Sequence, residues 1–205
     1  MKRIFDLTFS LLGLIICSPI FIMVPIFIKL DSKGPVFFRQ ERVGKNFKSF
    51  KIYKFRTMRH DPGEKGPMIT ISGDRRVTEV GRFLRQYKVD ELPQLFNVLK
   101  GEMSFVGPRP EVKEYVQLFK KDYKKLLRIR PGITDPASIK YSDEERVLSS
   151  SENWEEEYKK RILPGKIDLS LQYVEQHNIT TDLKIILKTL LKAGRHKSPQ
   201  LPSRT

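Results

Sequence analysis

The chain has 205 residues, enough for one domain that buries a sizeable core. Its 39 Lys and Arg against 24 Asp and Glu give a net charge of +15, which favours an anionic partner such as nucleic acid, acidic lipid or a phosphorylated substrate. The one cysteine excludes an intrachain disulfide and a Cys-based zinc cluster, and the three scattered histidines exclude a His-x-x-x-His metal site.

The N-terminal segment is an uncharged run over residues 7–28, long enough for a membrane helix. Ser18-Pro19 in its middle predicts a kink or break, because proline removes a backbone donor and clashes with the preceding turn. Basic residues flank both ends, so a kinked span and a re-entrant hairpin both remain open. Asp6 is costly here unless it is paired, and helical spacing makes Arg3 its nearest partner.

A strongly basic segment follows. Residues 33–59 carry nine positive charges and one negative charge. The stretches Val36-Phe37-Phe38-Arg39-Gln40 and Phe50-Lys51-Ile52-Tyr53-Lys54-Phe55 lie on either side of Gly44-Lys45-Asn46, which predicts a β-hairpin with its turn at these residues. A loop over 60–74 and a short helix over 78–87 are expected next.

Strong helix signals run from Asp90 to Gly101, because Asp is a good N-cap and glycine stops a helix. Two adjacent carboxylates at the positive end of a helix, with Arg85 just upstream, favour the ionised form and a site that collects anions. Asp90 could then attack phosphorus while Glu91 holds a divalent metal. The alternative is a plain helix cap.

Two stiff loops each carry an arginine. Pro108-Arg109-Pro110 resembles an anion clamp, since proline limits backbone freedom and a guanidinium group binds phosphate through two hydrogen bonds. Arg130-Pro131-Gly132 repeats the arrangement. A structural salt bridge for Arg109 and an ordinary turn at Arg130 are the alternatives. Arg85, Arg109 and Arg130 are therefore the candidate substrate-binding residues.

Residues 111–128 and 182–192 predict basic amphipathic helices. Such helices suit a membrane interface, while an apolar face buried in the core is the alternative. Residues 144–157 carry six Glu around Trp154 and predict a solvent-facing helix or loop. The tail over 193–205 has no periodicity, which predicts disorder.

These elements predict an α+β fold that is mainly helical, with a small β-hairpin. The expected parts are a membrane element over 1–32, a catalytic domain over 33–192 on the membrane interface, and the tail over 193–205. The chain lacks the glycine-rich Rossmann and P-loop signatures, the Gly-x-Ser-x-Gly elbow and an Asp-x-Asp pair. The chemistry must therefore come from carboxylates and arginines.

Several longer motifs follow one another along the chain: Lys2-Arg3-x-x-Asp6, Ser18-Pro19, Gly34 to Gly44, Lys51 to Met58, Asp90-Glu91-Leu92-Pro93-Gln94, Gly107-Pro108-Arg109-Pro110 and Arg130-Pro131-Gly132-Ile133-Thr134. In these motifs, and over residues 2–191, the chain resembles the bacterial sugar transferases called monotopic phosphoglycosyl transferases. Because several long motifs stand in the family's order, the match is highly specific.

The resemblance implies transfer of a sugar 1-phosphate from a UDP-sugar to undecaprenyl phosphate, with release of UMP. It implies that Asp90 is the nucleophile of a covalent phospho-sugar intermediate and that Glu91 binds Mg²⁺. It also implies a re-entrant helix turned at Ser18-Pro19, interfacial amphipathic helices, and a place on the cytoplasmic face of the bacterial inner membrane. The membrane motif of this helix includes Lys2, Arg3 and Asp6. The expected partners are the two substrates and membrane phospholipid.

The chain departs from the family pattern at one loop. Many members read Gly-Ile-Thr-Gly-Leu-Ala-Gln, where this chain reads Gly132-Ile133-Thr134-Asp135-Pro136-Ala137-Ser138. If this loop touches the sugar, the donor preference of better-known members does not transfer. The chain also lacks the additional membrane helices of larger relatives, so we expect a minimal catalytic unit.

Other functional classes stay open. A membrane-tethered nucleic-acid binder is allowed by the net charge, but the basic residues do not form a recognisable nucleic-acid-binding pattern, so no nucleic-acid partner is expected. A non-catalytic scaffold for acidic lipid is the second class. Among enzymes, the alternative is a single displacement with Asp90 as a base. The sequence leaves the sugar and the oligomeric state undetermined.

Overall fold

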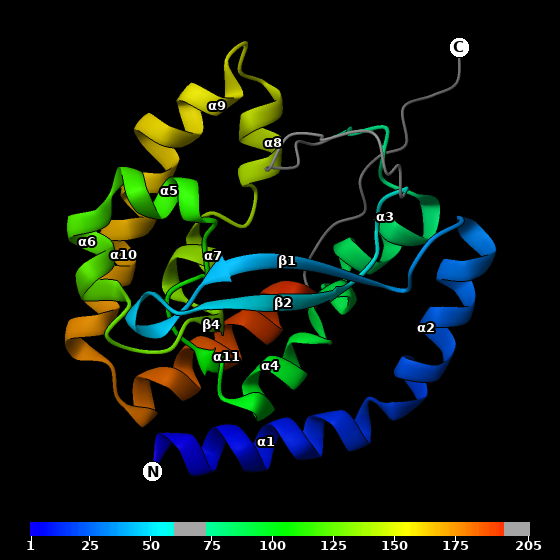
Figure 1. Cartoon of the computed structure of the whole chain (residues 1–205), viewed down its shortest axis with the longest axis horizontal. Helices are drawn as coiled ribbons and strands as arrows, with labels where there is room; N and C mark the ends of the chain where they lie inside the picture. Colours follow the sequence, from blue (N-terminus) through cyan, green and yellow to red (C-terminus); the bar gives the residue numbers. More distant parts are fainter. Residues whose placement is uncertain (60–72, 195–205) are drawn as a thin grey trace.

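The computed structural model describes residues 1–59 and 73–194 (Figure 1). Within them the chain is mainly helical, with one antiparallel hairpin and one short parallel strand pair, which confirms the α+β expectation. The loop expected over 60–74 and the tail expected over 193–205 fall almost entirely outside the described residues.

The helices are α1 (Lys2–Ile16), α2 (Ser18–Asp31), α3 (Glu79–Gln86), α4 (Gln94–Lys100), α5 (Lys113–Leu118), α6 (Lys120–Leu126), α7 (Pro136–Lys140), α8 (Glu144–Ser149), α9 (Trp154–Glu157), α10 (Leu163–Gln176) and α11 (Ile179–Gly194). The strands are β1 (Phe37–Val43), β2 (Ser49–Phe55), β3 (Ser104–Val106) and β4 (Gly132–Thr134). Short helical turns lie at η1 (Lys45–Phe47), η2 (Val89–Glu91) and η3 (Tyr158–Ile162).

The predicted break at Ser18-Pro19 is confirmed, because α1 ends at Ile16 and α2 begins at Ser18. In Figure 1, α1 runs along one edge of the molecule and α2 turns away from it. No single helix in residues 1–59 and 73–194 is long and apolar enough to cross a membrane. Helices α1 and α2 meet that test only together, bent by 59°, as a broken span or a re-entrant loop. Their exposed apolar side chains are Ile4, Leu7, Phe9, Leu11, Leu12, Ile15, Ile16, Ile22, Met23, Ile26, Phe27 and Leu30.

The polar residues of α1 bind the rest of the protein. The expected pairing of Arg3 with Asp6 is wrong. Arg3 donates to Val98 O (2.7 Å) and Leu99 O (2.9 Å), which are carbonyls at the end of α4. Helix ends leave such carbonyls without intrahelical partners, so they attract a guanidinium group. Asp6 instead accepts a hydrogen bond from the Ser104 hydroxyl (3.0 Å).

Lys2 links the N-terminal helix to the C-terminal helix α11. Lys2 Nζ donates to Val106 O (3.1 Å) and forms an ion pair with Asp182 of α11. Helix α1 is therefore fixed against β3 and α11. The polar groups of the membrane motif thus turn inward, while its apolar side chains stay exposed.

The predicted β-hairpin is confirmed. Strand β1 pairs antiparallel with β2, and the register places Phe37 opposite Phe55 and Val43 opposite Ser49. The turn lies at the expected Gly44-Lys45-Asn46, where Asn46 adopts a left-handed conformation (φ 54°) that asparagine tolerates. The predicted helix over 78–87 is also confirmed as α3.

Asn97 of α4 fixes the hairpin to the helix that follows the candidate catalytic residues. Its side chain is fully buried; Oδ1 accepts from Tyr53 N (3.0 Å), and Nδ2 donates to Lys51 O (2.8 Å) and Glu102 Oε2 (2.7 Å). We expect Asn97→Ala to lower the free energy of unfolding by about 2 kcal/mol, because two backbone groups of β2 and the Glu102 carboxylate lose their partner. Thermal melts of both proteins, with the exposed Gln117→Ala as a control, measure this loss. An unchanged melting temperature would contradict this role of Asn97.

The single amphipathic helix expected over 111–128 is wrong in one respect. The backbone breaks at Phe119 (φ −119°, ψ 39°), which separates α5 from α6. Of the two interpretations of its apolar face, the structure supports burial in the core over a membrane interface. The buried residues of this face are Val112, Tyr115, Val116, Tyr123, Leu126 and Leu127, in one core cluster with η3 and α10. The break allows both short helices to face this same core.

On helix α11, by contrast, most of the apolar face is exposed. Ile185 is buried and Ile186 is half-buried, whereas Leu183, Leu187, Leu190 and Leu191 are 49–65% exposed. The amphipathic pattern over 182–192 therefore leaves an uncovered apolar face. The acidic segment forms α8 and α9, which are fixed to the core by the fully buried Leu148.

Candidate active site

The turn that carries Asp90 and Glu91 lies between α3 and α4. Lys88 is left-handed (φ 57°), and the hydrogen bonds Glu91 N to Lys88 O (3.2 Å) and Leu92 N to Val89 O (3.1 Å) close the tight turn η2. Helix α4 begins only at Gln94, so the prediction of Asp90 as its N-cap is wrong. The side chains of both acids turn into the protein instead. Gly101 ends the helix as predicted (φ 85°).

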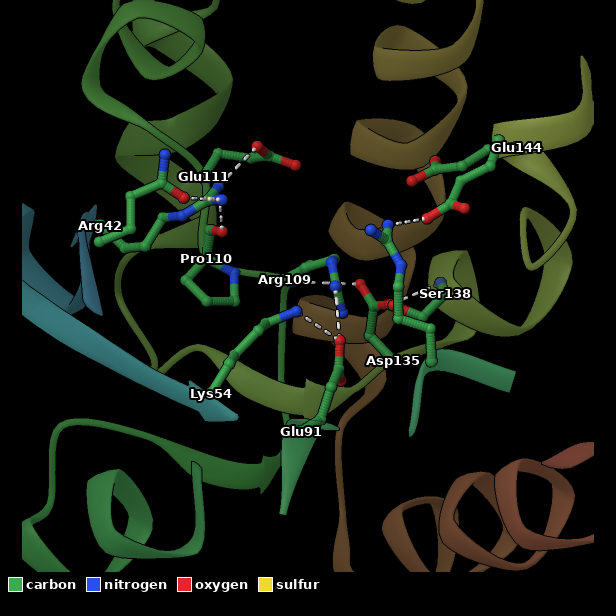
Figure 2. Close-up of polar contacts among 12 residues, drawn as sticks. Arg42, Lys54, Glu91, Arg109, Pro110, Glu111, Asp135, Ser138 and Glu144 are labelled. Carbon is green, nitrogen blue, oxygen red and sulfur yellow. Dashed lines mark hydrogen bonds and ion pairs between the residues drawn. The ribbon is translucent and has the colours of Figure 1, made fainter. Parts of the chain in front are cut away.

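Glu91 is the centre of a charged cluster. Its Oε1 accepts hydrogen bonds from Lys54 Nζ (2.7 Å) and from Arg109 Nη2 (2.9 Å), as Figure 2 shows. Lys54 comes from the end of β2, and Arg109 from the proline-flanked loop after β3. Three elements far apart in the sequence thus place two cations on one carboxylate oxygen.

The two cations set the ionisation of Glu91. Although burial by itself raises the pKa of a carboxyl group, the positive charges of Arg109 and Lys54 hold the pKa of Glu91 well below its usual range. The charge of Glu91 in turn raises the pKa of Arg109. Burial lowers the pKa of Lys54, and Glu91 opposes this shift. Glu91 is therefore an anion committed to its two partners.

Asp90 differs from Glu91 in its hydrogen bonding and in the direction of its pKa shift. It is 7% exposed, and its Oδ1 is buried with no hydrogen-bond partner among the described residues. Burial raises its pKa, and the nearby charge of Lys54 opposes this rise. A buried polar atom without a partner is destabilising, so in a native protein it calls for an explanation such as a catalytic role or a bound water or ion. Asp90 therefore presents an uncommitted carboxylate oxygen beside a positive cluster.

The other two candidate arginines lie in different places. Arg85 Nη2 pairs with Glu145 Oε1 of α8 (2.6 Å), yet Arg85 lies close enough to Asp90 for its charge to lower the pKa of that carboxyl. Arg130 Nε donates to Gly101 O (2.8 Å), at the opposite end of α4. The structure thus brings Arg109 to Glu91, leaves Arg85 at the edge, and gives Arg130 a contact with the backbone.

Lys54 is the residue of this cluster that the sequence analysis did not single out. It was one positive charge among nine in the basic hairpin segment. The available signal was its position in the Lys51–Met58 motif, next to Phe55, which the structure buries almost completely. Nothing local distinguishes it from the neighbouring lysines, because its function depends on a partner 37 residues away.

A magnesium ion at this cluster would share its ligands with the substrate. No group of three or more His, Cys, Asp and Glu side chains able to hold a metal occurs in residues 1–59 and 73–194. Mg²⁺, however, is commonly bound by one or two carboxylates together with substrate phosphates and water. Asp90 Oδ1, which has no partner among the described residues, is the oxygen that fits such an ion. Glu91 Oε1 already accepts from Lys54 and Arg109, so the binding of Mg²⁺ by Glu91 stays a prediction.

A family model described as "Bacterial sugar transferase" matches residues 1–196. The chain belongs to the bacterial sugar transferase family. This confirms the resemblance carried by the sequence motifs.

Curated relatives agree with this assignment. The chain is 35% identical over 197 residues to the UDP-N-acetylgalactosamine-undecaprenyl-phosphate N-acetylgalactosaminephosphotransferase of Aeromonas hydrophila, covering 92% of this chain and 42% of the relative. It is 40% identical over 196 residues to the undecaprenyl-phosphate glucose phosphotransferase of Komagataeibacter xylinus, covering 92% and 35%. It is 38% identical to the exopolysaccharide production protein PSS of Rhizobium leguminosarum, covering 93% and 94%. The chain thus spans less than half the length of the first two relatives and nearly the whole of the third.

Proposed function

We propose that this bacterial sugar transferase moves a sugar 1-phosphate from a UDP-sugar to undecaprenyl phosphate, through a covalent phospho-sugar on Asp90. The observation that carries the proposal is the buried, unpartnered Asp90 Oδ1 beside Lys54, Glu91 and Arg109. The printed names of the relatives describe transfer of a sugar phosphate with undecaprenyl phosphate, which supports the substrate class.

Two displacements at one phosphorus atom account for the reaction. Asp90 Oδ attacks the phosphorus next to the sugar, an O–P bond forms, and the bond to the bridging oxygen breaks, so that UMP leaves. An oxygen of undecaprenyl phosphate then attacks the same phosphorus and releases Asp90. Each step exchanges one phosphate linkage for another, so positioning and charge neutralisation are the main requirements.

Each side chain of the cluster has its own role in these two displacements. Arg109 and Lys54 offer positive charge to the donor phosphates, and Arg109 has the planar group that binds phosphate through two hydrogen bonds. Glu91 keeps both cations in place next to Asp90. A bound Mg²⁺ would supply further neutralisation of phosphate charge at Asp90 and Glu91. Because Asp90 acts as an anion, acidification that protonates it stops the first displacement.

Nucleotide release tests this function. Purified protein in detergent, with Mg²⁺ and undecaprenyl phosphate, is offered a panel of UDP-sugars. We expect UMP from one donor, and incubation without the lipid should leave the phospho-sugar on Asp90, detected by mass spectrometry of the peptide. Release of UDP would contradict phosphoryl transfer. UMP release without any trapped intermediate would favour a single displacement with Asp90 as a base.

The membrane arrangement belongs to the same proposal. We infer that α1 and α2 re-enter one leaflet and that the exposed face of α11 lies along it, on the cytoplasmic side of the inner membrane. The support is the 59° bend between α1 and α2 and the uncovered apolar side chains of all three helices. A lipid phosphate acceptor would then meet Asp90 from the bilayer surface.

Leu187 tests the part of α11 in membrane binding. Its side chain is 58% exposed, so Leu187→Gln leaves the fold intact but removes apolar surface from the proposed interface. A buried leucine contributes about 1.5 kcal/mol or more, so we expect vesicle binding to weaken roughly tenfold. Leu118→Gln is the matched control, because Leu118 on α5 is equally exposed at 59% and lies outside the proposed face. Equal losses in both variants would contradict the interface.

A further inference from the structure

The departure of this chain from the family pattern is Asp135-Pro136, and Asp135 lies beside Arg109 of the candidate active site (Figure 2). Asp135 is fully buried and begins α7, where its Oδ1 accepts from Ser138 N (2.7 Å) as a helix cap. Its Oδ2 accepts from the Ser170 hydroxyl of α10 (2.9 Å). A carboxylate buried to this extent needs such donors, and these two join α7 to α10.

The remaining contact of Asp135 reaches the arginine loop. Arg109 N donates to Asp135 Oδ2 (3.3 Å). Proline has no backbone N–H, so this is the one backbone donor that Pro108-Arg109-Pro110 can offer. Asp135 therefore holds the loop by its sole N–H group, at the residue whose guanidinium group reaches Glu91 Oε1 (2.9 Å).

The backbones of the two loops are already aligned for this contact. Gly107 N donates to Thr134 O (3.1 Å), and Gly132 N donates to Pro108 O (3.1 Å). The approach is so close that a Cβ on Gly132 would lie 2.1 Å from Gly107 N, which only glycine avoids. Asp135 follows Thr134 directly, so the strand pairing sets its carboxylate beside Arg109.

Packing alone does not fix Arg109 on this side. A cavity of about 20 Å³, room for about one water molecule, is lined by Arg109, Asp135 and Ser170 among others. Hydrogen bonds rather than close-packed side chains therefore define the position of the loop here.

We propose that Asp135 is a positioning residue, which holds the Arg109 backbone so that the guanidinium group stays on Glu91 beside Asp90. Asp135 acts through Arg109 and touches no substrate. The structural part of this inference stands on the described contacts alone, and its kinetic part rests on the proposed function.

Asp135→Asn tests the structural part without any turnover. Asparagine is as good an N-cap as aspartate, so α7 is retained. The asparagine side chain has only one acceptor oxygen, however, so it can no longer accept hydrogen bonds from both Ser138 N and Arg109 N. We expect Glu91→Gln to lower the melting temperature less in the Asp135→Asn background than in the wild type, because the pairing of Arg109 with Glu91 is already weakened there. Ser138→Ala is the control, because it removes a hydroxyl group without a partner among the described residues and keeps the backbone N–H. An undiminished effect of Glu91→Gln in Asp135→Asn would overturn the proposal.

A double-mutant cycle tests the kinetic part. We expect Asp135→Asn to lower kcat/KM about 100-fold in the wild-type background, as misplacement of a catalytic group does. In the Arg109→Ala background the same change should have little further effect, because the group it positions is gone. Equal losses in both backgrounds mean a general structural role and overturn the proposal. If the wild type itself releases no UMP, the proposed function fails, and the melting temperatures of the Asp135→Asn and Glu91→Gln variants still decide the role of Asp135.

Discussion

Asp90→Asn is expected to reduce UMP release by at least about 10³-fold, the scale seen when an enzyme loses its nucleophile. Asparagine keeps the size and shape of the side chain but cannot form the acyl-phosphate bond. In the structure Asp90 has a buried, unpartnered Oδ1, and burial raises its pKa, so the charge itself destabilises the folded protein. Removing that charge should leave the melting temperature unchanged or raise it.

This combination of lost turnover and retained stability separates chemistry from folding. Asp122→Asn, on helix α6 in the basic part of the chain, is the matched control and should keep full activity. Rates come from UMP release and stability from thermal melts in the same detergent. Appreciable turnover by Asp90→Asn would contradict its role as nucleophile. A large fall in its melting temperature would mean that Asp90 is needed for the fold.

Glu91→Gln is expected to have the largest effect on stability. The change leaves Lys54 and Arg109 facing each other without the anion that joins them. Breaking a buried ion pair costs about 3–5 kcal/mol, and about 3 kcal/mol is expected here because Arg109 is one-third exposed. For a chain of this length that corresponds to a fall of roughly 6–12 °C in melting temperature. Glu145→Gln, which breaks the more exposed pair with Arg85, should change it little.

The pH dependence of this loss follows from the pKa of Glu91. Its pKa is near 4.5 in the unfolded chain and well below 4.5 in the folded protein. The stabilisation is therefore fully present above pH 4.5 and is lost as the pH falls through the lower, folded value. The difference in melting temperature between wild type and Glu91→Gln should stay constant from pH 7 to pH 5 and shrink in stronger acid. A difference that widens on acidification would contradict the assignment of the charge.

Local sequence chemistry predicted the elements whose causes are local. The hairpin turn at Gly44-Lys45-Asn46, the break at Ser18-Pro19 and the end of α4 at Gly101 each depend on the conformational preferences of one or two residues. The family motifs likewise pointed to Asp90 and Glu91, and the proline-flanked Arg109 was interpreted separately as an anion clamp. The structure confirms that Glu91 and Arg109 meet.

Two of the errors share one physical cause. Arg3 was paired with Asp6 by helical spacing, whereas the ends of other elements offered both residues better partners. Lys54 was indistinguishable from its neighbours. In both cases the decisive partner is distant in sequence, so no local pattern records it. Asp90 is different: it has the chemistry of an N-cap, but the tight turn at η2 directs it inward, where its Oδ1 has no partner among the described residues.

The sequence by itself determined the family, the two helices broken at Ser18-Pro19 and the residue types available for phosphate chemistry. The tertiary structure decided which amphipathic helices are covered, since periodicity shows that a face is apolar but not what packs on it; α5 and α6 are buried, while α11 stays exposed. It also decided the electrostatics of the site. Lys54 lies 37 residues before Glu91 and Arg109 lies 18 after it, and only the folded chain brings both charges to one carboxylate oxygen.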